Sequence, residues 1–221
     1  MSDYRHRFLD LALEAQALKF GEFVLKSGRK SPYFFNAGQF FRSDQLTTLA
    51  ACYAERLQET QITFDVIFGP AYKGIPLATA IACEYARRGH QVSLAYDRKE
   101  QKTHGEGGMF VGAPLHGKRV MVIDDVITAG TAIRSALPGI RAQGGTVVGV
   151  GVALDRQEII QQGDARTALD ALSAEIDAPI VAIVDITTIL TFIKNHPSLA
   201  HYRTSLEAYQ AHYCIHHHPP K

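Results

Sequence analysis

The 221-residue chain is 46% hydrophobic and 20% charged, a globular composition that excludes general disorder. Its formal net charge of +1 gives no overall field for nucleic acid or an anionic membrane, so an anionic ligand needs a local group of cations. No apolar run approaches the length of about 18 residues needed to span a bilayer, residues 1–10 are no signal peptide, and three widely spaced cysteines fit reduced thiols, so we expect a cytoplasmic protein.

The N-terminal part predicts two helices separated by a β-hairpin. Ser2-Asp3 can cap a helix over residues 4–17, whose apolar side chains recur at helical spacing. Apolar segments at 20–25 and 32–36 flank a turn-like Ser-Gly-Arg sequence and predict the hairpin. Ser43 begins a second helix with an apolar stripe along one side.

Short apolar strands then alternate with helices. The strands are predicted at 66–68, 92–96, 119–123, 146–154 and 180–184, and the helices at 75–88, at 132–143 and toward the C-terminus. This alternation predicts the α/β class, with one mostly parallel sheet covered by helices on both faces. Ligands bind such sheets beyond the carboxyl ends of the strands, so we expect the chemistry after Phe68, Tyr96 and Ile123.

The strongest chemical signal is residues 120–132, which read VMVIDDVITAGTA. Two adjacent carboxylates, Asp124 and Asp125, can accept hydrogen bonds from a vicinal diol. The Thr-Ala-Gly-Thr turn then opens a helix, where backbone N–H groups and the helix dipole favour a phosphate. The acidic pair alone would also fit a strand end before a capped helix, or the Mg²⁺-binding acidic cluster of a receiver domain.

The complete segment resembles the signature with which type I phosphoribosyltransferases bind 5-phosphoribosyl-1-pyrophosphate (PRPP). The resemblance implies that family's fold, a central, mostly parallel sheet with helices on both faces and an N-terminal helix-and-hairpin hood. It also implies that the two carboxylates hold the ribose hydroxyls while the turn binds the 5′-phosphate. The signature residues expected to bind PRPP are Asp124, Asp125, Val126, Ile127, Thr128, Ala129, Gly130, Thr131 and Ala132. Neither a P-loop nor a complete dinucleotide-binding glycine pattern occurs in the sequence.

The loop over residues 69–76, GPAYKGIP, follows a strand and opens a helix. Its backbone amides and Lys73 can meet a second anionic group, although by itself it would fit an ordinary strand-to-helix loop with a solvated lysine. Beside the signature it resembles the family's pyrophosphate loop. That resemblance implies that Tyr72 and Lys73 contact the ligand and that the peptide bond before Tyr72 is strained or cis.

Fixed cations gather in the glycine-rich residues 97–108, DRKEQKTHGEGG. A charged run is most often a solvated surface loop, but cations are also what a departing pyrophosphate requires. The pattern R-K-x-x-K-x-H-G-E-G is complete and resembles the catalytic loop of the orotate-specific members of the family. This implies a homodimer that shares the loop between subunits: Arg98 acts in its own subunit, while Lys99, Lys102 and His104 reach across.

Two further segments resemble the orotate-specific enzymes. Residues 26–36, KSGRKSPYFFN, would by themselves fit a strand with one aromatic facing the core and one facing out. The resemblance places a pyrimidine stacked on Phe34 and Phe35, with Lys26 near the substrate. Arg156 ends a strand and can pair with a carboxylate through two hydrogen bonds, a role the family gives it toward orotate. The residues expected to bind orotate are Lys26, Phe34, Phe35, Thr128 and Arg156.

The implied activity is Mg²⁺-dependent transfer of the phosphoribosyl group from PRPP to orotate, giving orotidine 5′-monophosphate and pyrophosphate in pyrimidine synthesis. The further residues expected to bind PRPP are Lys26, Tyr72, Lys73, Arg98, Lys99, Lys102 and His104. The residues expected to be catalytic are Asp125, Lys99, Lys102 and His104. We expect Mg²⁺ to be held mainly through PRPP, with no metal-ligand set of the protein's own. Two alternatives remain, a type I enzyme acting on another base and a noncatalytic PRPP-sensing regulator.

We expect one domain over residues 1–221, with a base-binding hood at 1–42, a PRPP-binding core at 60–195 and a C-terminal helix and tail at 196–221. The tail is rich in histidine, but a frayed chain end is favoured over a metal site there. The expected partners are orotate, PRPP and a second copy of the chain, with no nucleic acid and no membrane.

Overall fold

A computed structural model describes residues 4–25, 27–102, 108–127, 130–160 and 166–215, with the backbone alone for 101, 102 and 108. The strands are β1 (Leu18–Val24), β2 (Lys30–Phe35), β3 (Val66–Gly69), β4 (Ser93–Lys102), β5 (Gly108–Gly112), β6 (Arg119–Ile123), β7 (Thr146–Asp155) and β8 (Ile180–Asp185). The α-helices are α1 (Tyr4–Glu14), α2 (Ser43–Glu59), α3 (Gly74–Arg87), α4 (Thr131–Ala142), α5 (Ala168–Ile176), α6 (Ile186–Lys194) and α7 (Arg203–Tyr213). Two 3-10 helices, η1 (Ala37–Gln39) and η2 (Pro197–Tyr202), complete the described elements.

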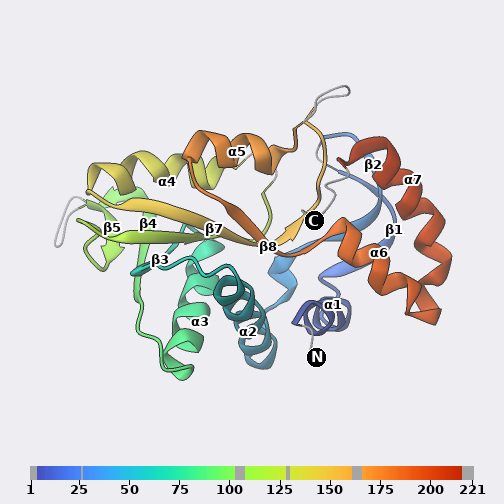
Figure 1. Ribbon diagram of the computed structural model, residues 1–221, viewed down its shortest axis with the longest axis horizontal. Coiled ribbons are helices and arrows are strands. Elements are labelled where there is room, and N and C mark those ends of the chain that lie inside the picture. Colours follow the sequence, from blue (N-terminus) through green and yellow to red (C-terminus); the bar gives the residue numbers. More distant parts are fainter. Residues whose placement is uncertain (1–3, 26, 103–107, 128–129, 161–165, 216–221) are drawn as a thin grey trace.

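The centre of the molecule is a sheet in the order β5-β4-β3-β6-β7-β8 (Figure 1). All neighbouring pairs are parallel except β4 and β5, which are antiparallel. The inner strands are continuously apolar because both of their faces are covered; every residue of β3 is buried. The predicted mostly parallel α/β sheet is therefore confirmed.

Helices cover both faces of the sheet and divide the core in two. On one face, α4 and α5 pack over side chains such as Val122 and Val150. On the other face, α2 and α3 pack over Ile67, Met121 and Ile123. Figure 1 shows α4 and α5 above the sheet and α2 and α3 below it.

The predicted N-terminal helix and hairpin are confirmed. β1 and β2 form a separate two-stranded antiparallel sheet, which lies beside α7 and beyond the β8 edge of the central sheet (Figure 1). α1 ends at Glu14, three residues before the predicted end, because Gln16 takes a left-handed conformation with φ 54°. The predicted cap at Ser2-Asp3 lies outside the described residues.

Two elements differ from the sequence prediction. The segment 97–108 is predicted as a loop, but β4 continues to Lys102 and Gly108 begins the edge strand β5. The charged residues 97–102 extend β4 beyond its pairing with β3, which ends at Tyr96, and a charged, glycine-rich sequence is more typical of a solvated loop than of a strand. The helix α5 was not predicted either, although Thr167 and Asp170 form a capping box at its start.

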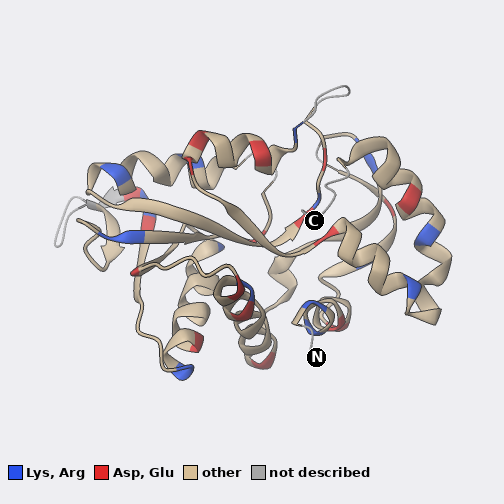
Figure 2. Ribbon diagram, in the orientation of Figure 1, with Lys and Arg blue, Asp and Glu red and all other residues tan. Residues whose placement is uncertain are grey.

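Charge is spread over the described structure. Figure 2 shows basic and acidic residues interspersed along the helices, in keeping with the small net charge. Within the described ranges, none of the helices has the length and apolar character that crossing a bilayer would require.

Candidate active site

Three neighbouring strands place their carboxyl ends together. In parallel register, Val66 of β3 pairs with Ser93 of β4 on one side and with Val120 of β6 on the other. Parallel strands in register end at the same edge of the sheet, so the segments after Phe68, Tyr96 and Ile123 meet there, as the sequence predicts.

The loop after β3 is held close to the end of β6 by two glycines. A Cβ on Gly74 would lie 2.7 Å from Cδ of Pro70 and 2.8 Å from the backbone oxygen of Ile123. A Cβ on Gly69 would lie 2.4 Å from the backbone oxygen of Gly74. These contacts are too short for any residue with a side chain, so glycine is what lets the loop pack against β6.

The same loop is tied to β4. The backbone N–H of Ala71 donates to Oδ1 of Asp97 at 2.6 Å. Burial raises the pKa of Asp97 above its ordinary value, while the Ala71 hydrogen bond acts in the opposite direction. The peptide bond between Ala71 and Tyr72 is cis, as the family resemblance implied.

Lys73 and the acidic pair meet across the sheet edge. Nζ of Lys73 lies 2.8 Å from Oδ2 of Asp125, although the residues are 52 positions apart. Oδ1 of Asp125 accepts the backbone N–H of Val126 at 2.8 Å. The side chain of Asp125 is 13% exposed and that of Lys73 is 60% exposed, so the lysine is free to move while the carboxylate is held.

The pKa of Asp124 is raised from 3.8 to about 6, mainly by burial of the carboxyl group. The negative charge of Asp125 contributes to this rise, whereas the hydrogen bond from the Asp125 N–H at 2.9 Å and the charge of Lys73 act in the opposite direction. The backbone oxygen of Asp124 accepts the hydroxyl of Tyr53 at 2.8 Å, which fixes this end of β6 to α2.

The rest of the signature leads into α4. Val126 forms a parallel bridge with Leu154 of β7, and Ile127 is buried. Gly130 takes a left-handed conformation with φ 65°, which glycine adopts without strain, and α4 begins at Thr131. Thr131 is exposed and Ala132 half-buried. Thr128 and Ala129, both predicted to bind, lie outside the described residues.

The cations of β4 are only partly described. Nη1 of Arg98 is buried and has no hydrogen-bond partner among the described residues. Nζ of Lys99 lies 4.9 Å from the centroid of the exposed Tyr72 ring, within cation–π range. His104 and the side chain of Lys102 lie outside the described residues.

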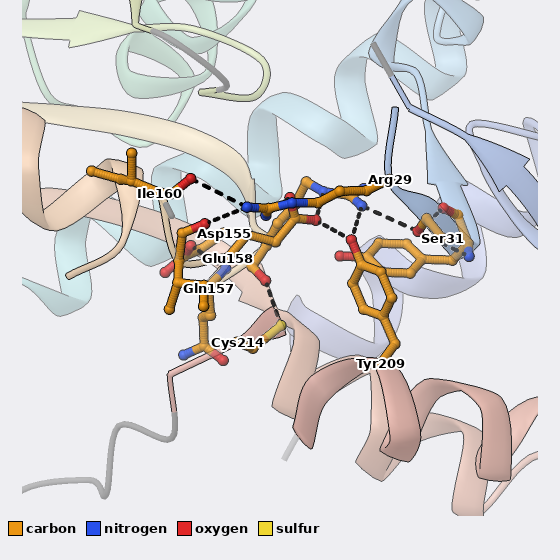
Figure 3. Close-up of polar contacts among 11 residues, drawn as sticks. Arg29, Ser31, Asp155, Gln157, Glu158, Ile160, Tyr209 and Cys214 are labelled. Atoms are coloured by element: carbon orange, nitrogen blue, oxygen red, sulfur yellow. Dashed lines mark hydrogen bonds and ion pairs between the residues drawn. The ribbon is translucent and has the colours of Figure 1, made fainter. Parts of the chain in front are cut away.

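Arg156 follows β7 and reaches the hairpin. Its Nε lies 2.6 Å from Oε1 of Glu158, and its Nη2 donates to Oγ of Ser31 at 3.2 Å and to the hydroxyl of Tyr209 at 3.3 Å. Its guanidinium carbon lies 4.4 Å from the centroid of the Tyr33 ring. Figure 3 shows three of these partners close together: Ser31 from the hairpin, Glu158 from just after β7 and Tyr209 from α7.

The predicted aromatic pair lies on β2. Phe35 packs against Phe8 and Phe40, and Phe34 is 39% exposed and stacks on Phe23. One therefore faces the core and the other faces outward, as expected for a strand. Because Ser31, Tyr33 and Phe35 share one face of β2, Arg156 lies over the same face as Phe35. Lys26 lies outside the described residues.

Sequence reasoning missed three residues that hold the predicted ones in place: Asp97, Glu158 and Tyr209. Asp97 could have been found, because it follows the apolar part of β4 just as Asp124 follows β6. Glu158 lies two residues after Arg156 and pairs with it locally, whereas Tyr209 carries no local signal, since only the packing of α7 brings it to Arg156.

Comparison with known proteins agrees with this arrangement. The family described as the phosphoribosyl transferase domain matches residues 37–166, a span that includes the Lys73 loop, β4 and the acidic pair. The chain therefore belongs to the phosphoribosyltransferases.

Individual relatives show to which group of phosphoribosyltransferases the chain is most similar. The orotate phosphoribosyltransferase of Stenotrophomonas maltophilia (strain K279a) is 57% identical over 215 residues, which cover 97% of this chain and 98% of that protein. That of Xanthomonas campestris pv. campestris (strain B100) is 55% identical over 213 residues, covering 96% of this chain and 97% of the relative. The crystal structure of orotate phosphoribosyltransferase from Francisella tularensis is 38% identical, covers 94% of this chain and 99% of its own, and superposes with a TM-score of 0.84. Within the phosphoribosyltransferases, the chain is a member of the orotate phosphoribosyltransferase family.

Proposed function

We propose that the chain transfers the phosphoribosyl group of PRPP to orotate. N1 of orotate loses its proton and attacks C1′ of PRPP, the C1′–O bond to pyrophosphate breaks, and the products are orotidine 5′-monophosphate, pyrophosphate and the released proton. The observation that carries the proposal is the contact between Lys73 and Asp125, because it joins a cation loop and an acidic pair at one edge of the sheet. Membership of the orotate phosphoribosyltransferase family supports the choice of base.

The acidic pair would hold the ribose hydroxyls. Each carboxylate has a fixed orientation, since Asp124 accepts the Asp125 N–H and Asp125 accepts the Val126 N–H. PRPP would then replace the Lys73–Asp125 pair: the lysine turns to the pyrophosphate, and Oδ2 of the held Asp125 carboxylate accepts from the diol instead. This exchange costs little because an ion pair with a largely exposed lysine is typically worth about 1 kcal/mol or less.

The 5′-phosphate would lie at the start of α4. Gly130 and Thr131 lead directly into this twelve-residue helix, whose first N–H groups and dipole favour an anion. A phosphate at this position would lie beside the signature residues up to Ala132, which the sequence predicts to bind PRPP. Phosphate bound there and ribose bound at Asp125 would fix C1′ toward the Lys73 loop.

Catalysis would depend on positioning and on stabilising the departing charge. Nη1 of Arg98, which is buried and has no partner in the part of the chain that the structure describes, is a donor that an anion would satisfy. Lys99, Lys102 and His104 would add to the positive field around pyrophosphate. All three would be supplied by the neighbouring subunit of a homodimer. Removing one preorganised donor of this kind typically costs on the order of 10²–10³ in rate.

Magnesium is the cofactor we propose. Asp124 and Asp125 provide carboxylate oxygens, the kind of ligand Mg²⁺ prefers, beside the proposed position of the diol. The ion would be held mainly by oxygens of PRPP and by water, with these carboxylates close by. When bound, Mg²⁺ would neutralise part of the pyrophosphate charge.

Orotate would lie between the hairpin and the end of β7. Arg156 carries a fixed positive charge over the face of β2 that also bears Phe35. A guanidinium pairs well with a planar carboxylate, and orotate differs from uracil by that group. Contacts with Phe35 and Arg156 would select a pyrimidine that carries a carboxylate, whereas Phe34, on the opposite face of β2, lies apart from Arg156.

The test is loss of orotate absorbance when PRPP and Mg²⁺ are added to the purified chain. We expect one pyrophosphate released for each orotate consumed, and none when either substrate is omitted. Consumption of another base, with orotate untouched, would assign the chain to a different substrate. Binding of PRPP without turnover of any base would make it a PRPP sensor.

A further inference from the structure

Glu158 lies between two arginines and shares its two oxygens between them. Oε1 accepts hydrogen bonds from Nε of Arg156 and from the hydroxyl of Tyr209, both at 2.6 Å, and Oε2 lies 3.4 Å from Nη1 of Arg29. Nη2 of Arg29 also donates to the backbone oxygens of Ile159 at 2.8 Å and Ile160 at 3.2 Å. Figure 3 shows these groups as one connected network.

The division of Glu158 leaves Arg156 able to bind a second anion. A carboxylate that used both oxygens on Arg156 would neutralise it and occupy its fork of donors. Here one oxygen is engaged by Arg29, so the two arginines and one glutamate keep a local charge of +1. Nη1 of Arg156 donates to no partner among the described residues and remains the donor available to a ligand.

The orientation of Arg156 is fixed by groups from three parts of the chain. Ser31 of β2 and Tyr209 of α7 both accept from Nη2, and the ring of Tyr33 lies beneath the guanidinium. The Arg156 side chain is only 11% exposed, so its other rotamers are excluded by packing. A long side chain restrained in this way loses little further conformational entropy when it binds a ligand.

We propose that Glu158 and Tyr209 are positioning residues that hold Arg156 with Nη1 directed at the carboxylate of the substrate. The inference rests on the proposed function, which makes orotate that substrate. It assigns to the C-terminal helix α7 a part in recognition of the base, through one hydroxyl group. Arg29 contributes by holding the second oxygen of Glu158.

Tyr209→Phe tests the proposal, because it removes the shared hydroxyl and keeps the ring and the net charge. We expect the KM for orotate to rise on the order of tenfold, as for the loss of a hydrogen bond to a charged group, with kcat and the KM for PRPP changed less than twofold. Tyr213→Phe is the matched control on the same helix, since the Tyr213 hydroxyl makes no hydrogen bond among the described residues. A merely structural role would lower the thermal midpoint and kcat and leave the ratio of the two KM values unchanged.

Glu158→Gln gives a second, independent measurement. If Glu158 positions Arg156, the KM for orotate rises here too; if it only competes with orotate as a counter-ion, the KM falls, and the proposal is overturned. Equal orotate KM values for Tyr209→Phe and Tyr213→Phe, in an enzyme that consumes orotate, overturn this inference alone. A wild-type chain that does not consume orotate overturns the proposed function and this inference together.

Discussion

Neutralising Asp124 should stabilise the chain at neutral pH, whereas neutralising the adjacent Asp125 should not. Burial raises the pKa of Asp124 from 3.8 to about 6, so the folded chain binds a proton there more tightly than the unfolded chain. At about 1.4 kcal/mol per pH unit, the difference amounts to about 3 kcal/mol of stability. This contribution is fully present below pH 3.8 and is lost as the pH rises through about 6, because the buried side chain must then carry its charge.

Asp124→Asn removes that cost and keeps an oxygen for the Asp125 N–H. At pH 8 we expect the variant to be more stable than the wild type by about 3 kcal/mol, or about 6–12 °C in thermal midpoint for a chain of this length. Below pH 4 the two should unfold at the same temperature. The variant should also bind PRPP more weakly, since the proposed contact with the ribose needs the carboxylate.

Asp125→Asn is the control, because the same chemical change falls on the residue that pairs with Lys73. It should leave stability unchanged or lower it by about 1 kcal/mol or less at pH 8. Thermal unfolding at pH 4 and pH 8 for the three proteins gives the comparison. Equal midpoints for Asp124→Asn and the wild type at pH 8 would refute the argument that burial of this charge costs stability.

Three further predictions concern the loops and the base site. Lys102→Ala should keep the thermal midpoint and PRPP affinity but lower kcat on the order of 10²–10³, and normal turnover would remove this lysine from catalysis. Arg156→Ala should raise the KM for orotate far more than that for PRPP; the reverse pattern would remove Arg156 from the pyrimidine pocket. Gly74→Ala should lower stability by about 1–3 kcal/mol in a melting experiment, because its Cβ would lie within 2.8 Å of Pro70 and Ile123, and weaken PRPP binding by shifting the loop. Unchanged values for Gly74→Ala would show that the loop can move away from β6 without cost.

Much of the site could be predicted from local sequence because each of its parts is a continuous segment. The signature around Asp124 contains the strand, the acidic pair and the turn within thirteen residues, and the structure keeps that order. The loop around Lys73 is equally compact. Segments of this length specify which groups can bind a phosphate or a diol, and they do so before any long-range contact forms.

The edge strand β5 and the helix α5 show where local reasoning fails. β5 forms only because β4 offers it an unpaired edge, and its own sequence is rich in glycine. Strand propensity depends on such neighbours more than helix propensity does. α5 has a local signal in its capping box at Thr167, but its sequence contains none of the binding motifs.

The amino-acid sequence by itself determined which chemical groups this protein carries. They are an acidic pair, two segments that can bind an anion (the loop at 69–76 and the turn before α4) and an arginine, Arg156, each after a strand of an α/β chain. Only the tertiary structure decided which of these groups meet. Lys73 reaches Asp125 because β3 and β6 are neighbours in the sheet, and Arg156 reaches Ser31 and Tyr209 because the hairpin and α7 pack beside the end of β7. The physical reason is that contacts between residues 50 to 125 positions apart depend on the order of the strands and the packing of the helices, which no short segment encodes.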